Sequence, residues 1–257
     1  MFNPDFLNAV KVIDTSTSKN GSIYEVIEYI KPRANSNYSN SGTLSSLQYQ
    51  KLRQIRININ NSSIITQPGA LQFMKGPITM ELKSNSPNAV KGFFKSVGTG
   101  ESSITPKYSG KYGEIYLEPS FKYYYVIEME NEQIILDDGM FYCCDESIQL
   151  DVYTNTAVTG LFGGDGFKQP LLKGSGVAVL ESNVPFEEVL IYQLNNETIK
   201  IDGKFAIVVR GDINIKMEKS TNSVLGSIKS GEGILQTYTG TGEIWVAPGK
   251  LLKPLEI

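Results

Sequence analysis

The feature that most constrains the fold of this chain is a strand pattern that occurs three times. Apolar and polar residues alternate at 78–83, 148–153 and 213–218. Alternation with a period of two leaves one apolar face, which is typical of half-buried antiparallel strands. A turn glycine precedes each of these strands by nine or ten residues: Gly69, Gly139 and Gly203. Such glycines predict hairpins, so each copy should contain several strands.

The three copies also end alike. Each closes with a strand introduced by a Gly-rich turn, at 113–117, 176–180 and 242–246, and matching positions recur every 63 to 70 residues. A repeat of this kind organises the whole fold. We therefore predict an all-β fold in which three pseudo-repeats of antiparallel strands form a prism or barrel, with inward side chains filling its axis.

The chain is long enough for one all-β domain, 1–257, with a proper core. Its predicted divisions are N-terminal strands with a polar loop (1–49), three strand repeats (50–120, 121–183 and 184–248) and a C-terminal tail (249–257). The Asn- and Ser-rich stretch 33–46 is the loop. In the strand that opens the first repeat, Ile55, Ile57 and Ile59 should share the inner face.

The composition excludes several kinds of function. With 40% hydrophobic and 20% charged residues, the chain has an ordinary globular composition. The net charge of −3 provides no general attraction to phosphate backbones, so no nucleic-acid partner is expected. The chain has no histidine. Ser-His-Asp catalysis, Cys-His catalysis and His-ligated zinc are therefore all excluded.

Cysteine usage and hydropathy point to one compartment. Cys143 and Cys144 are adjacent and offer no disulfide framework, which fits a reducing environment. On a regular strand, one of the two should be buried and the other is a candidate for exposure, and without a histidine to lower a thiol pKa both are interpreted as inert. The N-terminal residues lack a basic segment followed by an apolar one, and no run approaches the roughly 20 apolar residues of a spanning helix. We expect a cytoplasmic protein.

The glycine-rich motifs resemble a known family. The closing motifs at 108–114, 174–176 and 238–243, with the segments 69–78 and 135–141, resemble bacterial relatives of the altered inheritance of mitochondria protein 24 family. The resemblance implies a fold similar to the tryptophan RNA-binding attenuation protein, a shortened double-stranded β-helix that tends to form oligomers. The bacterial members have no established activity, and the mitochondrial member is linked to inner-membrane organisation. Fold analogy alone does not transfer function.

Two features depart from the pattern of that family. One is the Asn- and Ser-rich insertion, and the other is an extra residue at 111–112 that widens the first closing turn.

No group of reactive side chains has the spacing that catalysis requires. The glycine clusters at 98–100, 164–166 and 231–233 lack the Lys-Ser or Lys-Thr of a phosphate loop and are interpreted as turns. Asp137 and Asp138 are explained by a hairpin turn without a metal. We therefore predict no catalytic residue, no cofactor and no metal, and a protein that is not an enzyme.

The connections before the closing strands carry large apolar residues where polar loops are expected. These residues are Val90, Phe93, Phe94, Val158, Leu161, Phe162, Val224, Leu225 and Ile228. Under threefold symmetry they meet at one end of the barrel. There they either plug the core or form a surface for self-association, a protein partner or a membrane surface.

The leading hypothesis is an uncharacterised, non-catalytic oligomeric scaffold or interaction protein. An alternative is a small-molecule or carbohydrate-binding β module in which tyrosines line a cleft between two repeats. The aromatic segment 121–125 could serve that purpose, although sheet packing explains it as well. A further alternative is a carboxylate-only hydrolase, which needs two inward acids facing each other across a groove.

Overall fold

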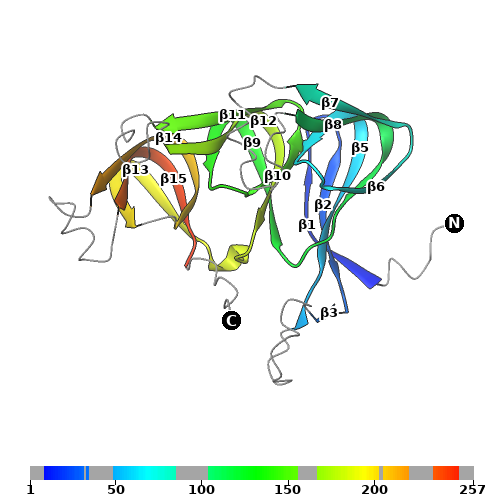
Figure 1. The fold of residues 1–257 in the computed structure, drawn as a ribbon, viewed down its shortest axis with the longest axis horizontal. Helices are drawn as coiled ribbons and strands as arrows, with labels where there is room; N and C mark the ends of the chain where they lie inside the picture. The colour runs from blue at the N-terminus through cyan, green and yellow to red at the C-terminus, as the bar shows by residue number, and fades with distance from the viewer. Residues whose placement is uncertain are drawn as a thin grey trace.

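The computed structural model describes residues 9–31, 33–34, 49–84, 104–155, 167–202, 205–219 and 234–248. These residues form antiparallel strands and one short 3-10 helix, η4 (Phe186–Glu188), which confirms the all-β prediction (Figure 1). The N-terminal strands are β1 (Val10–Thr17), β2 (Ile23–Tyr29), β3 (Arg33–Ala34) and β4 (Tyr49–Gln50). The remaining strands are β5 (Arg53–Thr66), β6 (Leu71–Lys75), β7 (Ile78–Ser84), β8 (Ile104–Leu117), β9 (Tyr123–Leu136), β10 (Phe141–Asp145), β11 (Ile148–Asn155), β12 (Phe167–Ser182), β13 (Leu190–Asp202), β14 (Ala206–Lys219) and β15 (Ile234–Val246).

One strand arrangement occurs three times. In each unit a long closing strand lies between a long first strand and a middle segment. In the first unit β8 lies between β5 and the short strands β6 and β7, and in the second unit β12 lies between β9 and the short strands β10 and β11. In the third unit β15 lies between β13 and β14. Here the middle segment is a single continuous strand, β14, in place of two short strands. The repeat predicted from the sequence is thus a repeat of strand order.

The closing strands differ from the prediction in the place of their glycines. β8, β12 and β15 run without a break past the glycines that were expected to form turns before them. At Gly242 in β15, φ is +152° and an added Cβ would lie 2.1 Å from the carbonyl oxygen of Arg210. The middle segment approaches the closing strand so closely here that no side chain fits.

Neighbouring units are joined by short ladders. β10 adds to β5, which places Cys143 opposite Thr66, and β14 adds to β9, which places Val208 opposite Leu136. In both joints the middle segment of one unit pairs with the first strand of the preceding unit. The corresponding third ladder would join β6 to β13. These two strands do not pair, and they lie at opposite ends of the molecule, so the sheet is not closed into a barrel (Figure 1).

The core follows the alternation seen in the sequence. Ile55, Ile57 and Ile59 of β5 are buried, as predicted. Buried apolar side chains form clusters on both faces of the sheet, and β10 contributes Cys143 to one cluster and Cys144 to another. Because β10 lies between β5 and β12, its side chains are covered on both faces.

Candidate functional site

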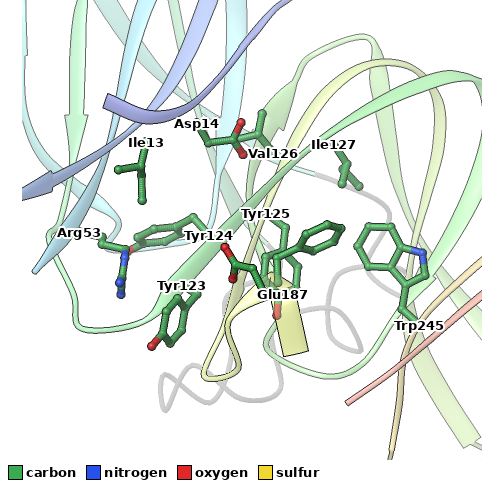
Figure 2. A pocket seen from close by; sticks show the side chains of 11 residues that line it. Ile13, Asp14, Arg53, Tyr123, Tyr124, Tyr125, Val126, Ile127, Glu187 and Trp245 are labelled. Carbon is green, nitrogen blue, oxygen red and sulfur yellow. The ribbon is translucent and has the colours of Figure 1, made fainter. Parts of the chain in front are cut away.

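A pocket of about 330 Å³ lies beside the first residues of β9. In the first unit, β2 pairs with residues 53–58 of β5. The corresponding residues of β9, 123–128, pair with β12 on one side, and among the described strands none pairs with their other side. Residues of β1, β5, β9, η4 and β15 surround this open side (Figure 2). The pocket therefore occupies the place that a strand takes in the first unit.

Aromatic rings form one wall of the pocket. The ring centroids of Tyr125 and Phe186, and those of Phe186 and Trp245, are 5.3 Å apart and edge-on. This geometry is favourable because the positive edge of one ring meets the negative face of the next. Tyr125 and Trp245 are buried, whereas Phe186 is exposed. Pro185, with its restricted φ, stands at the start of η4 and sets the position of Phe186.

Two of the three tyrosine hydroxyls that line the pocket already have partners. The Tyr124 hydroxyl shares a hydrogen bond of 2.8 Å with the Ser120 hydroxyl, and the Tyr125 hydroxyl donates to the carbonyl oxygen of Val184 at 2.5 Å. Burial raises the pKa of both tyrosines to about 12. Both side chains are therefore protonated at neutral pH and keep these hydrogen bonds.

The nitrogen donors that line the pocket are engaged except for the Nε of Arg53, which is buried and has no hydrogen-bond partner among the described residues. The indole N–H of Trp245 donates to Glu243 at 3.1 Å. Arg53 forms an ion pair with Glu28 at 2.9 Å, and its guanidinium carbon lies 4.1 Å from the centroid of the Tyr123 ring. Such a stacked guanidinium is held by the ring quadrupole as well as by its counterion.

Two carboxylates in the pocket lack a counterion. Asp14 of β1 and Glu187 of η4 line it, and neither forms an ion pair with any described residue. Burial raises the pKa of Asp14 from its ordinary value, although backbone N–H groups of Thr15 and Val126 oppose the shift. The unpaired charges of the pocket are thus both negative, beside aromatic surfaces.

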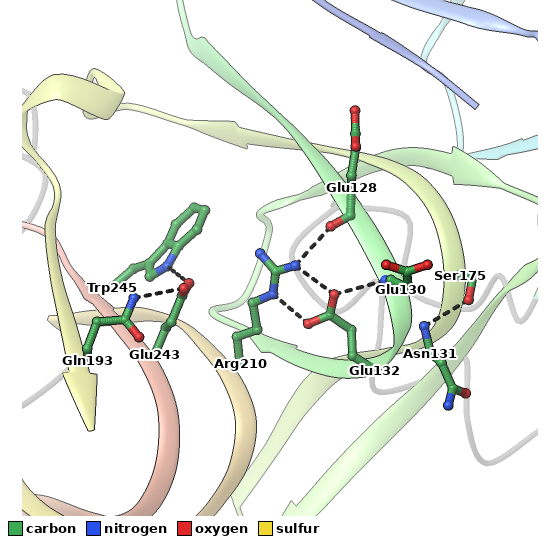
Figure 3. Close-up of polar contacts among 9 residues, drawn as sticks. All are labelled: Glu128, Glu130, Asn131, Glu132, Ser175, Gln193, Arg210, Glu243 and Trp245. Atoms are coloured by element: carbon green, nitrogen blue, oxygen red, sulfur yellow. Dashed lines mark hydrogen bonds and ion pairs between the residues drawn. The ribbon is translucent and has the colours of Figure 1, made fainter. Parts of the chain in front are cut away.

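A second polar cluster lies at the joint between the second and third units (Figure 3). Arg210 of β14 binds both carboxylate oxygens of Glu132 in β9, at 2.5 and 2.7 Å, and donates to the carbonyl oxygen of Glu128 at 3.0 Å. The hydrogen bond to Glu132 raises the pKa of Arg210. Since the charges compensate each other, we interpret this cluster as a fastening between units and not as a binding site.

The β6 end of the sheet exposes positions that the other units bury. Phe73 and Met74 are 48% and 39% exposed. The equivalent residues of the second unit, Cys143 and Cys144, are both 0% exposed because β10 is covered by the first unit. We refer to the unpaired side of β6, with Phe73 and Met74, as the β6 edge.

The β13 end shows the same contrast. Leu190 and Tyr192 are 52% and 45% exposed, whereas the equivalent residues of the first unit, Ile55 and Ile57, are 0% exposed. The equivalence follows from the ladders, because Tyr192 and Ile57 pair with corresponding residues of their closing strands. We refer to the unpaired side of β13 as the β13 edge. Each end of the sheet therefore carries one half of a joint that the chain makes twice internally.

The apolar connections predicted as an interaction surface lie outside the described residues. This holds for all nine: Val90, Phe93, Phe94, Val158, Leu161, Phe162, Val224, Leu225 and Ile228. Their role as a core plug or an interface stays a prediction. Of the polar loop predicted at 33–46, residues 33–34 form β3 instead, and the rest lies outside the described residues. Among the described residues, no group of three or more His, Cys, Asp or Glu side chains could hold a metal ion.

The cysteines are more buried than expected. One thiol was a candidate for exposure, but Cys143 and Cys144 are both buried and free of disulfides, which agrees with their interpretation as inert. Burial, with the neighbouring Cys144 and Asp145, raises the pKa of the Cys143 thiol well above its usual value. A protonated, covered thiol is a poor nucleophile.

The sequence allowed two interpretations of the tyrosines, a binding cleft and ordinary sheet packing, and the structure shows examples of both. Tyr123, Tyr124 and Tyr125 line the pocket, although the rings of Tyr124 and Tyr125 pack in different core clusters. Tyr108 packs in the core and Tyr112 is exposed, so neither takes part in it.

Sequence reasoning missed Asp14, Arg53, Phe186 and Trp245, which come from four distant elements. The available signal was the single tryptophan of the chain, at the position where the first unit has a tyrosine.

These observations define a class of protein: three-unit, all-β, with an open antiparallel sheet and an aromatic pocket between units. The chain belongs to the family described as Mitochondrial biogenesis AIM24, whose model matches residues 45–249. This confirms the resemblance found in the glycine-rich motifs. Among the described residues, no helix is long and apolar enough to span a membrane.

Two streptococcal proteins are similar to this chain. The uncharacterized protein M6_Spy0233 of Streptococcus pyogenes serotype M6 (strain ATCC BAA-946 / MGAS10394) is 26% identical over 194 residues, covering 73% of this chain and 77% of that protein. The crystal structure of protein SPYM3_0169 from Streptococcus pyogenes aligns with a TM-score of 0.54 at 23% identity, covering 79% of this chain and 90% of that one. The second likeness shows the fold alone.

Proposed function

We propose that this protein is a non-catalytic scaffold that assembles from copies of itself, the β6 edge of one copy pairing with the β13 edge of the next. One observation carries the proposal: positions that a neighbouring unit buries inside the chain are exposed at both ends of the sheet. An exposed apolar edge strand readily pairs with another strand. Contacts between two different edges lead to rings or filaments, depending on whether the rotation closes.

The internal joints supply the register of the proposed contact. The pairs Cys143 with Thr66 and Val208 with Leu136 occupy the same position in their joints. By the same alignment, Phe73 of one copy would lie opposite Ile201 of the next. Met74 would then lie opposite Lys200, as Cys144 lies opposite Ile65.

The burial of apolar side chains would drive this association. Fully burying a large apolar side chain contributes about 1.5 to 3 kcal/mol. Phe73, Met74, Leu190 and Tyr192 are each roughly half exposed in the single chain. A partner edge would cover them as Cys143, Cys144, Ile55 and Ile57 are covered within the chain.

The use of the buried carboxylates supports a non-catalytic role. Asp145 accepts hydrogen bonds from the hydroxyls of Ser18 and Tyr24, at 2.6 and 2.7 Å, and from the backbone N–H of Val177 at 2.7 Å. An acid held by three donors is committed to holding Ser18, β2 and β12 together. The free, buried thiols are compatible with a cytoplasmic setting, which is part of the proposal.

The mass of the purified protein by light scattering tests the assembly, and disulfide trapping tests the register. In a Met74→Cys/Lys200→Cys variant, mild oxidation should link copies into a ladder of covalent multimers. The matched control is Met74→Cys/Tyr192→Cys, which places thiols on the same strands but eight residues, or about 26 Å, out of register. Each single-cysteine variant should give dimers at most.

The outcomes separate the parts of the proposal. A strict monomer at all accessible concentrations refutes the assembly. An oligomer that the in-register pair does not trap refutes the edge contact while leaving assembly intact. If replacing Phe93, Phe94, Leu161 and Phe162 with polar residues then yields folded monomers, the apolar connections form the interface instead.

A further inference from the structure

The pocket beside β9 has a chemistry that the proposed assembly does not use. The hydroxyls of Tyr124 and Tyr125 and the indole N–H of Trp245 have partners within the chain, and the guanidinium of Arg53 is paired with Glu28, although its Nε is buried without a hydrogen-bond partner among the described residues. What it offers a ligand is two carboxylates, Asp14 and Glu187, and the faces of aromatic rings (Figure 2). We propose that this pocket binds a small organic cation, such as a quaternary ammonium or alkylammonium group.

The aromatic wall suits a positive charge. The ring faces of Tyr, Phe and Trp attract cations within about 6 Å of the ring centroid, and quaternary ammonium groups are recognised in this way. The pocket already holds one such contact, because the guanidinium of Arg53 lies over Tyr123. Phe186 lines the pocket, is 45% exposed, and packs edge-on against Tyr125 and Trp245.

The position of Asp14 points the same way. Asp14 is an exposed residue, although desolvation raises its pKa, and no cation compensates its carboxylate among the described residues. A structural role would not require a charge there, since a neutral amide could also accept from the backbone N–H of Thr15, 2.8 Å away. A bound cation would restore the missing counter-charge.

Other ligand classes fit the pocket less well. An anion would meet two carboxylates, while the one cationic side chain that lines the pocket, Arg53, is already paired with Glu28. A neutral sugar uses donors as well as acceptors, and of the three tyrosines that line the pocket only Tyr123 has a hydroxyl without a hydrogen-bond partner among the described residues. That hydroxyl points away from Trp245 (Figure 2). At about 330 Å³, the pocket is near the lower limit for ligand sites, which suits a ligand of few atoms.

The tryptophan fluorescence of the full chain provides the assay. Trp245 is the only tryptophan, so its emission reports on this pocket without a label. We would titrate choline, and in parallel its neutral isostere in which a quaternary carbon replaces the nitrogen, at constant ionic strength. The expected result is a saturable change with choline and none with the isostere.

Substitutions then assign the binding to the named residues. The Asp14→Asn/Glu187→Gln variant should raise the Kd for choline at least about tenfold. Phe186→Ala should raise it as well. The matched control is Glu188→Gln, which removes the same charge from the same 3-10 helix at a residue that does not line the pocket. Thermal unfolding of each variant checks that the fold is intact.

The proposal fails if choline gives no saturable change, or if the neutral isostere gives an equal one, which would make the pocket a general apolar cavity. It also fails if a neutral sugar displaces choline with comparable affinity, which would favour carbohydrate binding. An unchanged Kd in the Asp14→Asn/Glu187→Gln variant would place the bound choline elsewhere.

Discussion

Glu132→Gln tests whether the ion pair with Arg210 fastens the second unit to the third. The two side chains are 18% and 30% exposed, so solvent screens their attraction only in part. Hydrogen bonds to charged groups contribute about 1.5 to 3 kcal/mol, and bidentate geometry adds to this. After discounting for the remaining exposure, we expect the free energy of unfolding to fall by about 1 to 2 kcal/mol.

A double-mutant cycle isolates the pair from other effects. Arg210→Met alone should also destabilise, because it leaves the Glu132 carboxylate without its partner and removes the hydrogen bond to the carbonyl of Glu128. The double variant should lose less than the sum of the two single variants, with a coupling energy of about 1 kcal/mol. In a protein of this size that amount shifts the Tm by about 2 to 4 °C.

Urea unfolding followed by Trp245 fluorescence measures the cycle, since the tryptophan lies in the third unit. The m-value should stay constant across the four proteins, so that only the midpoint moves. A coupling energy below about 0.3 kcal/mol would refute the reasoning, because it would lie within the error of additivity. The joint between the units would then rest on the β9–β14 ladder and its apolar contacts.

Two further predictions concern a backbone constraint and a charge. Gly242→Ala should lower the free energy of unfolding by more than about 3 kcal/mol, because its Cβ would overlap the Arg210 carbonyl. Gly69→Ala should cost about 1 kcal/mol, because Gly69 has a φ of +78° but open space around it. Similar losses of the two variants in thermal unfolding would contradict this reasoning. Asp14 has a raised pKa in the folded protein, so its ionised form lowers stability above that pKa, and the cost disappears as the pH falls below the ordinary value of 3.8. The Asp14→Asn variant should therefore have a free energy of unfolding at least equal to that of the native chain at pH 7, and it should lose any advantage at acid pH. Urea unfolding measures both. A variant that is less stable than the native chain at pH 7 would be inconsistent with a desolvated charge at Asp14.

Much of the fold could be predicted from local pattern. The alternation in β5 placed Ile55, Ile57 and Ile59 in the core, and the turn glycines Gly69 and Gly139 have φ of +78° and +80°. These are properties of a few consecutive residues. The closing glycines were misplaced because a glycine in a turn and a glycine under a crossing strand look the same in sequence.

The pocket could be predicted only in part. The run of tyrosines at 123–125 was visible, and a cleft was one of two interpretations of it. Asp14, Phe186 and Trp245 are far apart in the chain, and each is unremarkable beside its neighbours. What makes them a site is the open side of β9, which no local pattern records.

By itself, the sequence determined that this protein is all-β and is built from three similar units, because the period-two alternation and the turn glycines act within each unit. Only the tertiary structure decided which copies of an equivalent position are buried. Cys143 and Phe73 occupy the same position in their units, yet one is covered by a preceding unit and the other is exposed. The physical reason is that burial depends on the neighbour across the sheet, and a chain of three units has a neighbour for every joint except the last.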